Sequence, residues 1–425
     1  MAEPKRVVIV GGGFGGLACA RALDGTDAAV TLLDRHNYHL FTPLLYQVAT
    51  ALLDPSDIAF PLRRAFRKSP NVRFRQATVT GVDLDARTVR THAGDEIGYD
   101  TLVLATGGTN NYFGNAPLAG HSIGMKTLPE AMRLRNHVLS CLEEAEQTRD
   151  TDERRTWLTF VVVGGGPTGV EYAGALRELL DLVLGRDYPS LKRSDARIVL
   201  VEGLDRLLGA FHPKLGRYAE ETLRRFGIEV RTQALVEKAD DSSVTLRSGE
   251  TIHARTIVWS AGVRPSDPLN GAPRARSKRL EADEYLRLRG RDEVFVIADA
   301  ASVATPKGEL PMLSPPAMQE GRYVARAINT GRSTKPFHYL DKGTMATIGR
   351  HAAVADVRGV KLKGILGWLA WLFVHIYYLI GFRNRAVVLA SWGWNYLRRD
   401  RPIRLILRSD LDPVAAELEP EPPPP

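Results

Sequence analysis

Apolar residues form short continuous runs near the beginning of the 425-residue chain. The run at residues 5–10 is typical of a strand buried on both faces of a parallel sheet. The glycine turn GGGFGG, the helical stretch LACARAL and a second apolar run at residues 28–34 follow. This order of elements predicts a β-α-β unit.

The same pattern returns in the middle of the chain. An apolar run at residues 157–163 leads into the turn GGGPTG, a helical stretch VEYAGALRELLDLVL and another apolar run at residues 196–202. Further strands are expected near residues 104, 259 and 296. We therefore predict an α/β fold with two Rossmann-like dinucleotide-binding domains, followed by C-terminal helices that associate with a membrane.

The first glycine turn has the spacing G-x-G-x-x-G. Such glycines allow a tight turn, a close approach of the backbone to a pyrophosphate, and close packing of helix on strand. A carboxylate at the end of the next strand can accept hydrogen bonds from ribose hydroxyls. A glycine-rich turn without a ligand is the alternative interpretation. The predicted contacts of the first dinucleotide are Gly11, Gly13, Phe14, Gly15, Gly16, Asp34 and Arg35.

The second glycine turn repeats the spacing at Gly164, Gly166 and Gly169, and Glu202 ends the following strand. A carboxylate there would bind a ribose 2′-hydroxyl and repel a 2′-phosphate, which favours NADH over NADPH. A solvated acid at a strand end is the alternative. Gly262, after the strand near residue 259, is a further predicted contact. Two sites imply two dinucleotides, most economically a fixed flavin and a diffusing nicotinamide.

The net charge of +8 is concentrated near the C-terminus. Ten Lys or Arg residues and one acid, Asp400, lie between residues 358 and 408. They flank an uncharged run at 365–382 and a second apolar run at 386–397. We predict a helix or hairpin that lies in an anionic membrane surface, on the cytoplasmic face, and no nucleic-acid partner. A true membrane span and a helix buried in a homodimer interface are alternatives.

Several longer strings resemble one protein family. LVLATGG (102–108) and VFVIADAA (294–301) resemble the additional flavin motifs of glutathione-reductase-like flavoproteins. YHLFTPLLYQVAT (38–50), SPPAMQEGRYVARAI (314–328), DKGTMATIGRHAAVAD (341–356) and WLFVHIYYLIGFRNR (371–385) resemble type II NADH:quinone oxidoreductases. The resemblance implies an FAD-dependent, non-proton-pumping enzyme that transfers electrons from NADH to a membrane quinone, either menaquinone or ubiquinone.

The resemblance also implies a domain division and a set of site residues. FAD is expected in residues 1–117 and 272–336, NADH in 118–271 and membrane anchoring in 337–412. The composition of residues 413–425 predicts a disordered tail. The resemblance adds Thr106, Gly107 and Asp299 to the expected FAD contacts. At position 298 this chain has alanine where the family motif usually has glycine. The resemblance also implies four catalytic residues near the nicotinamide, flavin and quinone: Glu171, Gln47, Gln319 and Glu320.

Each of these four residues also has a purely structural interpretation, as a satisfied loop residue, a helix N-terminal turn or packing beside the glycine helix. Ser314-Pro315 departs from the Ala-Gln step of some family members, and Pro315 has no amide hydrogen to donate. We propose that protons reach the quinone through water, Gln47 or Glu320.

The two cysteines, Cys19 and Cys141, exclude some relatives of this fold. They lie too far apart in sequence to form the redox pair of a disulfide reductase, and sulfide:quinone reductases also use paired cysteines. No metal site is expected. Two alternatives remain: the same scaffold with another acceptor, as in a diaphorase or a quinone-precursor reductase, and an apoptosis-inducing-factor-like flavoprotein that turns over slowly.

Overall fold

The computed structural model describes residues 3–266, 269, 272–306, 308–331, 335–398, 400–401 and 403–407. The predicted disordered tail, residues 413–425, lies outside the described residues, as do Arg399 and Arg408 of the basic cluster. Part of the chain that follows Gly262 is also outside them.

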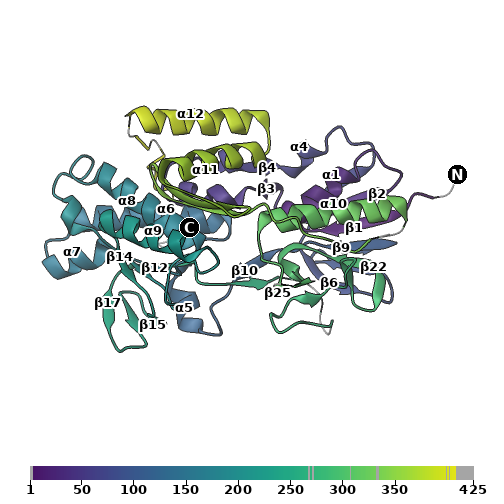
Figure 1. The fold of residues 1–425 in the computed structure, drawn as a ribbon, viewed down its shortest axis with the longest axis horizontal. Coiled ribbons are helices and arrows are strands. Elements are labelled where there is room, and N and C mark those ends of the chain that lie inside the picture. The colour runs from purple at the N-terminus through teal and green to yellow at the C-terminus, as the bar shows by residue number, and fades with distance from the viewer. Residues whose placement is uncertain are drawn as a thin grey trace, which may run out of the picture.

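The first unit contains a six-stranded sheet. Its strands come from both segments of the predicted FAD domain, residues 1–117 and 272–336. Val8 of its central strand is paired in parallel with Thr31 on one side and Leu102 on the other. Helices α1 (Phe14–Ala22) and α10 (Ser314–Thr330) lie side by side (Figure 1). The strands, in spatial order, are β21 (Arg287–Leu288), β22 (Arg291–Val296), β9 (Thr101–Leu104), β1 (Arg6–Val10), β2 (Ala29–Asp34) and β5 (Val72–Gln76).

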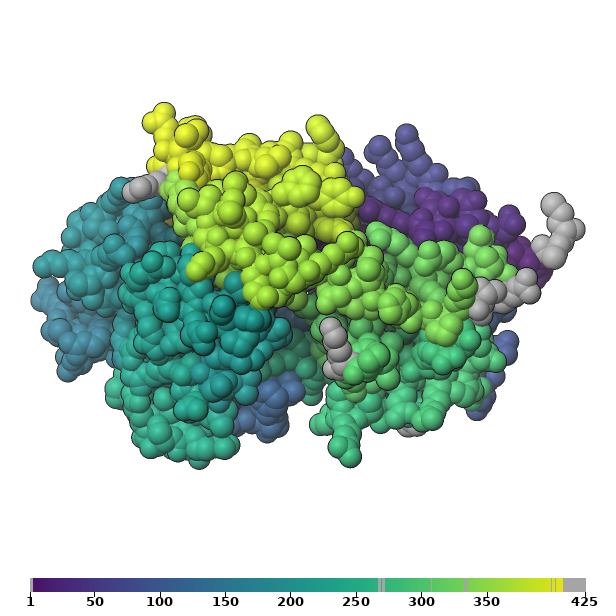
Figure 2. Space-filling view, viewed as in Figure 1, coloured from purple at the N-terminus to yellow at the C-terminus, as the bar shows by residue number. Residues whose placement is uncertain are grey.

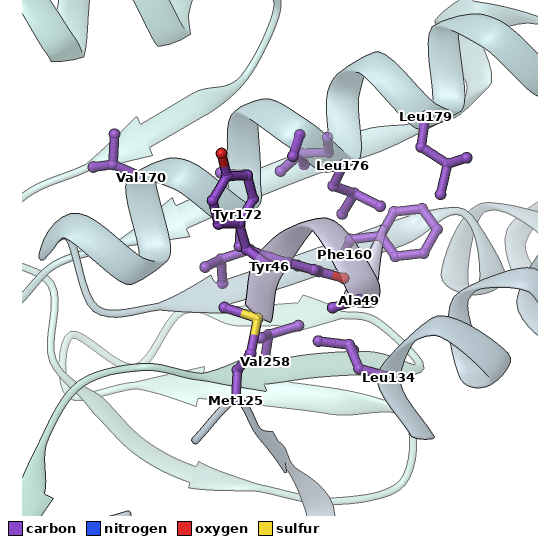
Figure 3. Close-up of a cluster of buried hydrophobic side chains, with 14 of the residues drawn as sticks. Tyr46, Ala49, Met125, Leu134, Phe160, Val170, Tyr172, Leu176, Leu179 and Val258 are labelled. Atoms are coloured by element: carbon purple, nitrogen blue, oxygen red, sulfur yellow. The ribbon is translucent and has the colours of Figure 1, made fainter. Parts of the chain in front are cut away.

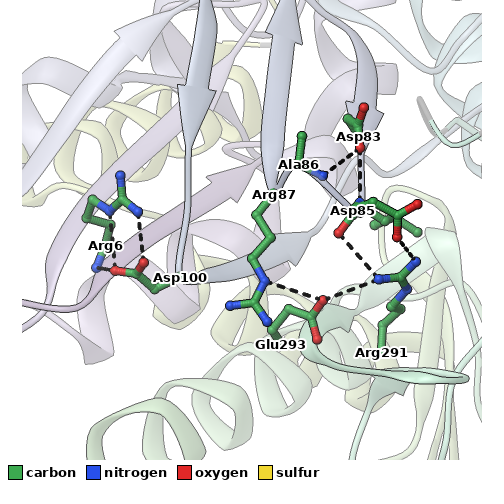
Figure 4. Close-up of polar contacts among 9 residues, drawn as sticks. Arg6, Asp83, Asp85, Ala86, Arg87, Asp100, Arg291 and Glu293 are labelled. Carbon is green, nitrogen blue, oxygen red and sulfur yellow. Dashed lines mark hydrogen bonds and ion pairs between the residues drawn. The ribbon is translucent and has the colours of Figure 1, made fainter.

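Ion pairs at the edge of this unit join segments that are distant in sequence. Arg6 binds Asp100, while Arg291 at the start of β22 reaches Asp85 in the turn between β6 (Val79–Asp83) and β7 (Thr88–Thr91) (Figure 4). Glu293 lies within ion-pair distance of both Arg87 and Arg291. Such exposed pairs contribute little each, about 0–1 kcal/mol, so the buried strands carry the stability of the sheet.

The second unit repeats the design with a five-stranded parallel sheet. All five residues of its central strand, β12 (Thr159–Val163), are buried, as the continuous apolar run predicts. Helices α6 (Leu128–Gln147), α8 (Pro167–Val183) and α9 (Pro213–Arg225) accompany it. The strands, in spatial order, are β11 (Ile123–Gly124), β18 (Thr256–Trp259), β12 (Thr159–Val163), β13 (Arg197–Val201) and β14 (Glu229–Arg231). The predicted fold class is confirmed.

A third layer lies across both units. It consists of a three-stranded antiparallel sheet, β26 (Thr344–Gly349), β27 (Ala352–Val357) and β28 (Val360–Lys363), and of helices α11 (Gly364–Tyr378) and α12 (Phe382–Arg398) (Figure 1). Trp371, Leu379 and Val388 of this layer are buried in one core with residues of α2 (Leu45–Ala49), α6 and α8. Figure 3 shows part of that core, where Tyr46 and Ala49 face Leu176 of α8.

The uncharged run at 365–382 is not one helix. Helix α11 ends at Tyr378, and Gly381 adopts a left-handed conformation with φ of 90° before α12 begins at Phe382. The two apolar runs therefore form a helical hairpin. Among the described residues, no helix is both long and apolar enough to cross a bilayer.

Polar contacts fix the end of this layer to the rest of the chain. The buried Arg401 donates to the Thr50 carbonyl at 2.7 Å and pairs with Glu178 of α8 at 2.9 Å. Asn384 donates to the Asp57 carbonyl at 3.0 Å. Because these partners belong to other layers, the hairpin has a defined place over the nucleotide-binding units.

Candidate active site

The first glycine turn forms an open helix N-terminus. Gly11 has φ of 108°, and a Cβ on Gly16 would lie 1.8 Å from the Gly11 carbonyl oxygen, so neither position tolerates a side chain. Gly13 caps α1 without a side-chain hydrogen bond, and the space beside it is free. The first N–H groups of the helix are thus available to a pyrophosphate, as FAD requires.

The second turn has the same geometry. Gly164 has φ of 110°, a Cβ on Gly169 would lie 1.9 Å from the Gly164 carbonyl oxygen, and Gly166 caps α8 without a side-chain bond. At Gly262, a Cβ would lie 2.8 Å from the exposed ring of Phe113, which would have to move to admit it. This turn fits the pyrophosphate of a second dinucleotide.

The two strand-end carboxylates hold matching positions. Asp34 accepts a hydrogen bond from the Gly12 N–H at 2.6 Å, and Glu202 accepts one from the Gly165 N–H at 2.6 Å. The other oxygen of each accepts from the backbone two residues further on, at His36 and Leu204. Each carboxylate oxygen has a second lone pair, which is free for a ribose hydroxyl. Both acids are therefore oriented by the turn that they follow.

The remaining predicted FAD residues surround the carboxyl end of the first sheet. Phe14 contacts the ring of His39 edge-on, and Gly15 faces Ala298. The Thr106 hydroxyl is buried and has no partner in the described part of the chain, which suits a contact with a bound flavin. Gly107 has φ of 70° and open space at its Cβ position. Arg35 is exposed, and Asp299 lies 3.5 Å from the ammonium of Lys126.

Ala298 occupies a strained backbone position. Its φ of 61° explains why glycine is usual there, since left-handed geometry disfavours a Cβ. Glu320, which is 2% exposed, accepts a hydrogen bond from the Ala298 N–H at 2.5 Å. Burial raises the pKa of Glu320 to about 7, although this hydrogen bond acts in the opposite direction. The pair fixes the turn next to Asp299.

A cavity of about 570 Å³ lies between α2, α8 and the C-terminal hairpin. Glu171, Ala175 and Glu178 form one wall, spaced so that they share a face of α8. Tyr46 and Gln47 of α2 are also part of the lining. The opposite wall comes from α11 and α12 and contains Trp368, Leu369, Trp371, Leu372, Phe373, Ile376, Leu389, Trp392, Gly393 and Tyr396.

Gln47 connects the α2 wall to the hairpin. Its side-chain oxygen accepts a hydrogen bond from the Trp392 indole at 2.8 Å, and its amide donates to the Tyr46 hydroxyl at 2.9 Å. Gln47 is buried, so this geometry leaves one amide hydrogen that can be directed to a ligand in the cavity.

Glu171 has the electrostatics of a proton-holding group. Its surroundings remove water from the carboxyl and raise the pKa of Glu171 to about 8, while the hydrogen bond from the Thr347 N–H at 3.2 Å acts in the opposite direction. At neutral pH the acid is therefore largely protonated. A neutral carboxyl in the cavity wall can donate a proton to a substrate in the cavity.

The structure brings only two of the four predicted catalytic residues to the cavity. Glu171 and Gln47 are part of its lining, whereas Gln319 and Glu320 are not. The Gln319 amide is bound to both backbone groups of Leu340, with bonds of 3.0 Å each. Gln319 thus fixes the segment that leads into the third layer, and Glu320 supports the turn at Ala298.

Sequence reasoning missed Trp392, Glu178 and Arg401. Trp392 lies in the second apolar run, where an indole gave only a membrane-surface signal. Arg401 belongs to the basic cluster, although it is buried against Glu178 at the edge of the cavity. No local pattern distinguishes such residues from lipid-facing ones, because their partners lie hundreds of positions away.

Two glycine turns that fit dinucleotides, on paired Rossmann-like units with a largely apolar cavity beside them, define a nicotinamide-dependent flavoprotein oxidoreductase. The family model of the pyridine nucleotide-disulphide oxidoreductases matches residues 5–321, and that of the NDH2 C-terminal domain matches residues 342–400. The chain is 39% identical to the type II NADH:quinone oxidoreductase NdhA of Mycobacterium tuberculosis, over 93% of this chain and 88% of the relative. It is 36% identical to Ndh of the same organism, over 93% and 89%.

Among solved structures, NDH2 from Plasmodium falciparum in complex with NADH shares the fold with a TM-score of 0.88 and 21% identity, over 95% of this chain and 100% of that one. The sulfide:quinone oxidoreductase of Aquifex aeolicus has a TM-score of 0.72 at 19% identity, over 95% and 96%. The chain belongs to the type II NADH:quinone oxidoreductases.

Replacing Ala298 by glycine should stabilise the protein. The left-handed geometry costs alanine about 1–2 kcal/mol, and the greater freedom of glycine in the unfolded chain offsets about half of that. We expect Ala298→Gly to raise the thermal midpoint of the FAD-loaded protein. The matched control Ala300→Gly, at a buried position with ordinary geometry, should lower it. Equal destabilisation by both changes would contradict the strain at Ala298.

The pKa of Glu171 predicts a pH-dependent stability. Because its folded-state pKa of about 8 lies above the ordinary value of 4.5, its contribution is complete below pH 4.5 and is lost as the pH rises through 8. Each pH unit in that window removes about 1.4 kcal/mol, less where cavity water screens the charge. We therefore expect the thermal midpoint of Glu171→Gln, relative to that of the wild type, to be higher at pH 8.5 than at pH 5.5. A constant gap between variant and wild type would exclude a neutral Glu171.

Proposed function

We propose that this chain oxidises NADH through bound FAD and reduces a membrane quinone in the cavity between α8 and the C-terminal hairpin. The observation that carries the proposal is the composition of that cavity, in which Glu171 and Gln47 face a wall of aromatic and aliphatic side chains. A quinone needs an apolar pocket for its ring and a few polar groups for its carbonyls. Bound FAD supplies the chemistry, accepting a hydride from NADH and passing two electrons to the acceptor.

The polar residues of the cavity have separate roles in this proposal. The free amide hydrogen of Gln47 binds a quinone carbonyl, and its bond to Trp392 fixes the amide in one orientation. Neutral Glu171 holds a proton at its carboxyl and delivers it to the reduced quinone. Glu320, which is buried beneath the Asp299 turn, orients that turn by its bond to Ala298 and is not a proton donor to the quinone.

The two dinucleotides are assigned to the two glycine turns. We propose FAD on the Gly11–Gly16 turn with Asp34 at the ribose, in a domain of residues 1–117 and 272–336. NADH is placed on the Gly164–Gly169 turn, in residues 118–271, with Glu202 excluding the 2′-phosphate of NADPH. The orientation of both carboxylates by their own turns supports two dinucleotide sites, and the order of FAD and NADH follows the family resemblance.

The membrane surface is the proposed environment of the hairpin. Phe373, Tyr377, Phe382 and Leu397 are 72%, 61%, 88% and 79% exposed, which is unusual for a surface without a partner. Arg383, which is also exposed, adds positive charge to the same hairpin. Apolar side chains mixed with arginine fit an anionic lipid surface on the cytoplasmic face better than a second copy of the chain, and a homodimer is the alternative.

The hydrogen bond between Trp392 and Gln47 provides a direct test of the proposed quinone site. Trp392→Phe keeps an aromatic ring but removes the indole donor, and a lost hydrogen bond costs about 0.5–1.5 kcal/mol. We expect KM for a short-chain quinone to rise about threefold to tenfold, with NADH oxidation by a soluble one-electron acceptor unchanged. Trp394→Phe, on the exposed side of the same helix, is the control and should change neither. Equal effects of both variants would argue against the cavity as the quinone site.

A further inference from the structure

A second cavity, of about 670 Å³, lies at the junction of the first unit and the hairpin. Its lining comes from α1 (Phe14, Leu17, Ala18, Arg21, Ala22), from α10 (Met318, Arg322), from His39, and from the end of α11 and the start of α12 (Tyr377, Tyr378, Ile380, Gly381, Arg385). In Figure 2 the yellow C-terminal helices meet the purple N-terminal part of the first unit in this region. The cavity shares no lining residue with the proposed quinone site.

Among the described residues, three arginines and no acid line this second cavity. Arg385 is fixed by donation to the carbonyls of Leu379 at 2.7 Å and Tyr377 at 2.8 Å. Arg21 and Arg322 form no ion pair with any acid in the described part of the chain. All three arginines are exposed at the surface, and partial desolvation lowers the pKa of Arg21. A group of cations with no acid beside it can bind an anionic ligand.

His39 adds a second requirement. Its Nδ1 lies 3.0 Å from the Gly12 carbonyl oxygen and must donate the hydrogen, so Nε2 of the neutral ring is an acceptor. That Nε2 is buried in a residue that is 2% exposed, and no described residue forms a hydrogen bond with it. Burial and the nearby Arg21 keep the pKa of His39 low, at about 4. A hydroxyl donor would satisfy the nitrogen, whereas a phosphate oxygen would not.

The location of the cavity identifies the source of the anion. Tyr377 belongs both to its lining and to the exposed apolar face of the hairpin. Phe382, next to Gly381 of the lining, is the most exposed large apolar residue of that face. A ligand with its phosphate among the arginines would therefore place attached acyl chains along the surface that faces the membrane.

We propose that this second cavity binds the headgroup of an anionic phospholipid, with the phosphate between Arg21, Arg322 and Arg385 and a headgroup hydroxyl at His39. A phosphoglycerol headgroup has both features. The membrane-facing orientation of the hairpin rests on the proposed function, but binding at the cavity can be measured without substrate or turnover. Lipid at this junction would join the first unit to the hairpin.

Native mass spectrometry of the FAD-loaded chain in mild detergent tests the proposal. We expect one phosphatidylglycerol per chain, bound at least tenfold more tightly than phosphatidylcholine. Arg21→Gln/Arg322→Gln should weaken it about thirtyfold, about fivefold for each arginine. The control pair Arg383→Gln/Arg398→Gln changes the same number of charges on α12 outside the cavity lining and should alter binding less than threefold.

Competition with free phosphate compounds shows whether the site recognises a lipid or any phosphate. The flavin spectrum and enzyme turnover show whether the variants are folded. Glycerol 3-phosphate and inorganic phosphate, at concentrations that match the lipid, should not displace it, because they lack acyl chains. The flavin spectrum and turnover with a soluble acceptor should be unchanged in both double variants, so that a loss of lipid is not a loss of fold. Equal losses in the two pairs, or displacement by free phosphate at matched concentration, would overturn the proposal.

Discussion

The burial of Trp371, Leu379 and Val388 in the core beneath the hairpin is the contact on which the active site depends. The first Rossmann-like unit has a core of its own, whereas the second unit shares one core with the third layer. The proposed quinone cavity exists only because α11 and α12 lie over α2 and α8. Arg401 and Trp392 then fix the register of this layer with polar contacts to Thr50, Glu178 and Gln47. Apolar burial supplies the free energy of this docking, and the few buried polar bonds determine its geometry.

The same layer controls the electrostatics of the cavity. Glu171 and Glu178 lie two turns apart on α8, yet their surroundings differ. Glu178 is paired with Arg401 and accepts a hydrogen bond from the Arg350 N–H, so its charge is compensated. Glu171 accepts a hydrogen bond from the Thr347 N–H, and burial among apolar walls raises its pKa to about 8. One helix thus presents an acid held in a salt bridge and a neutral acid that is suited to proton transfer.

The parts of the fold that sequence predicted well are those that local physics determines. A buried parallel strand, a glycine turn and a helix follow each other within about thirty residues, and only glycine fits at positions such as Gly11 and Gly16. Length and apolar content left a single helix and a hairpin both open for the apolar C-terminal runs, and the turn at Gly381 produces the hairpin. The cavity could not be predicted from local sequence, because residues such as Gln47 and Trp392, which form a hydrogen bond there, are 345 positions apart in the sequence. The family resemblance implied that Gln319 is a site residue. In the structure, its side chain binds the backbone of Leu340, a contact that no local sequence motif indicates.

The claim that the quinone is reduced between α8 and the hairpin is tested most directly by filling that space. Gly393 of α12 is part of the cavity lining, and a Cβ there would meet no atom within 4 Å, so Gly393→Phe should fold while its ring narrows the cavity. In anaerobic stopped-flow experiments, bleaching of the flavin by NADH should proceed at the wild-type rate, and its reoxidation by a short-chain quinone should slow at least tenfold. Leu397→Phe, on the same helix but outside the cavity, should slow neither step. Unchanged reoxidation in Gly393→Phe would place quinone reduction elsewhere in the molecule.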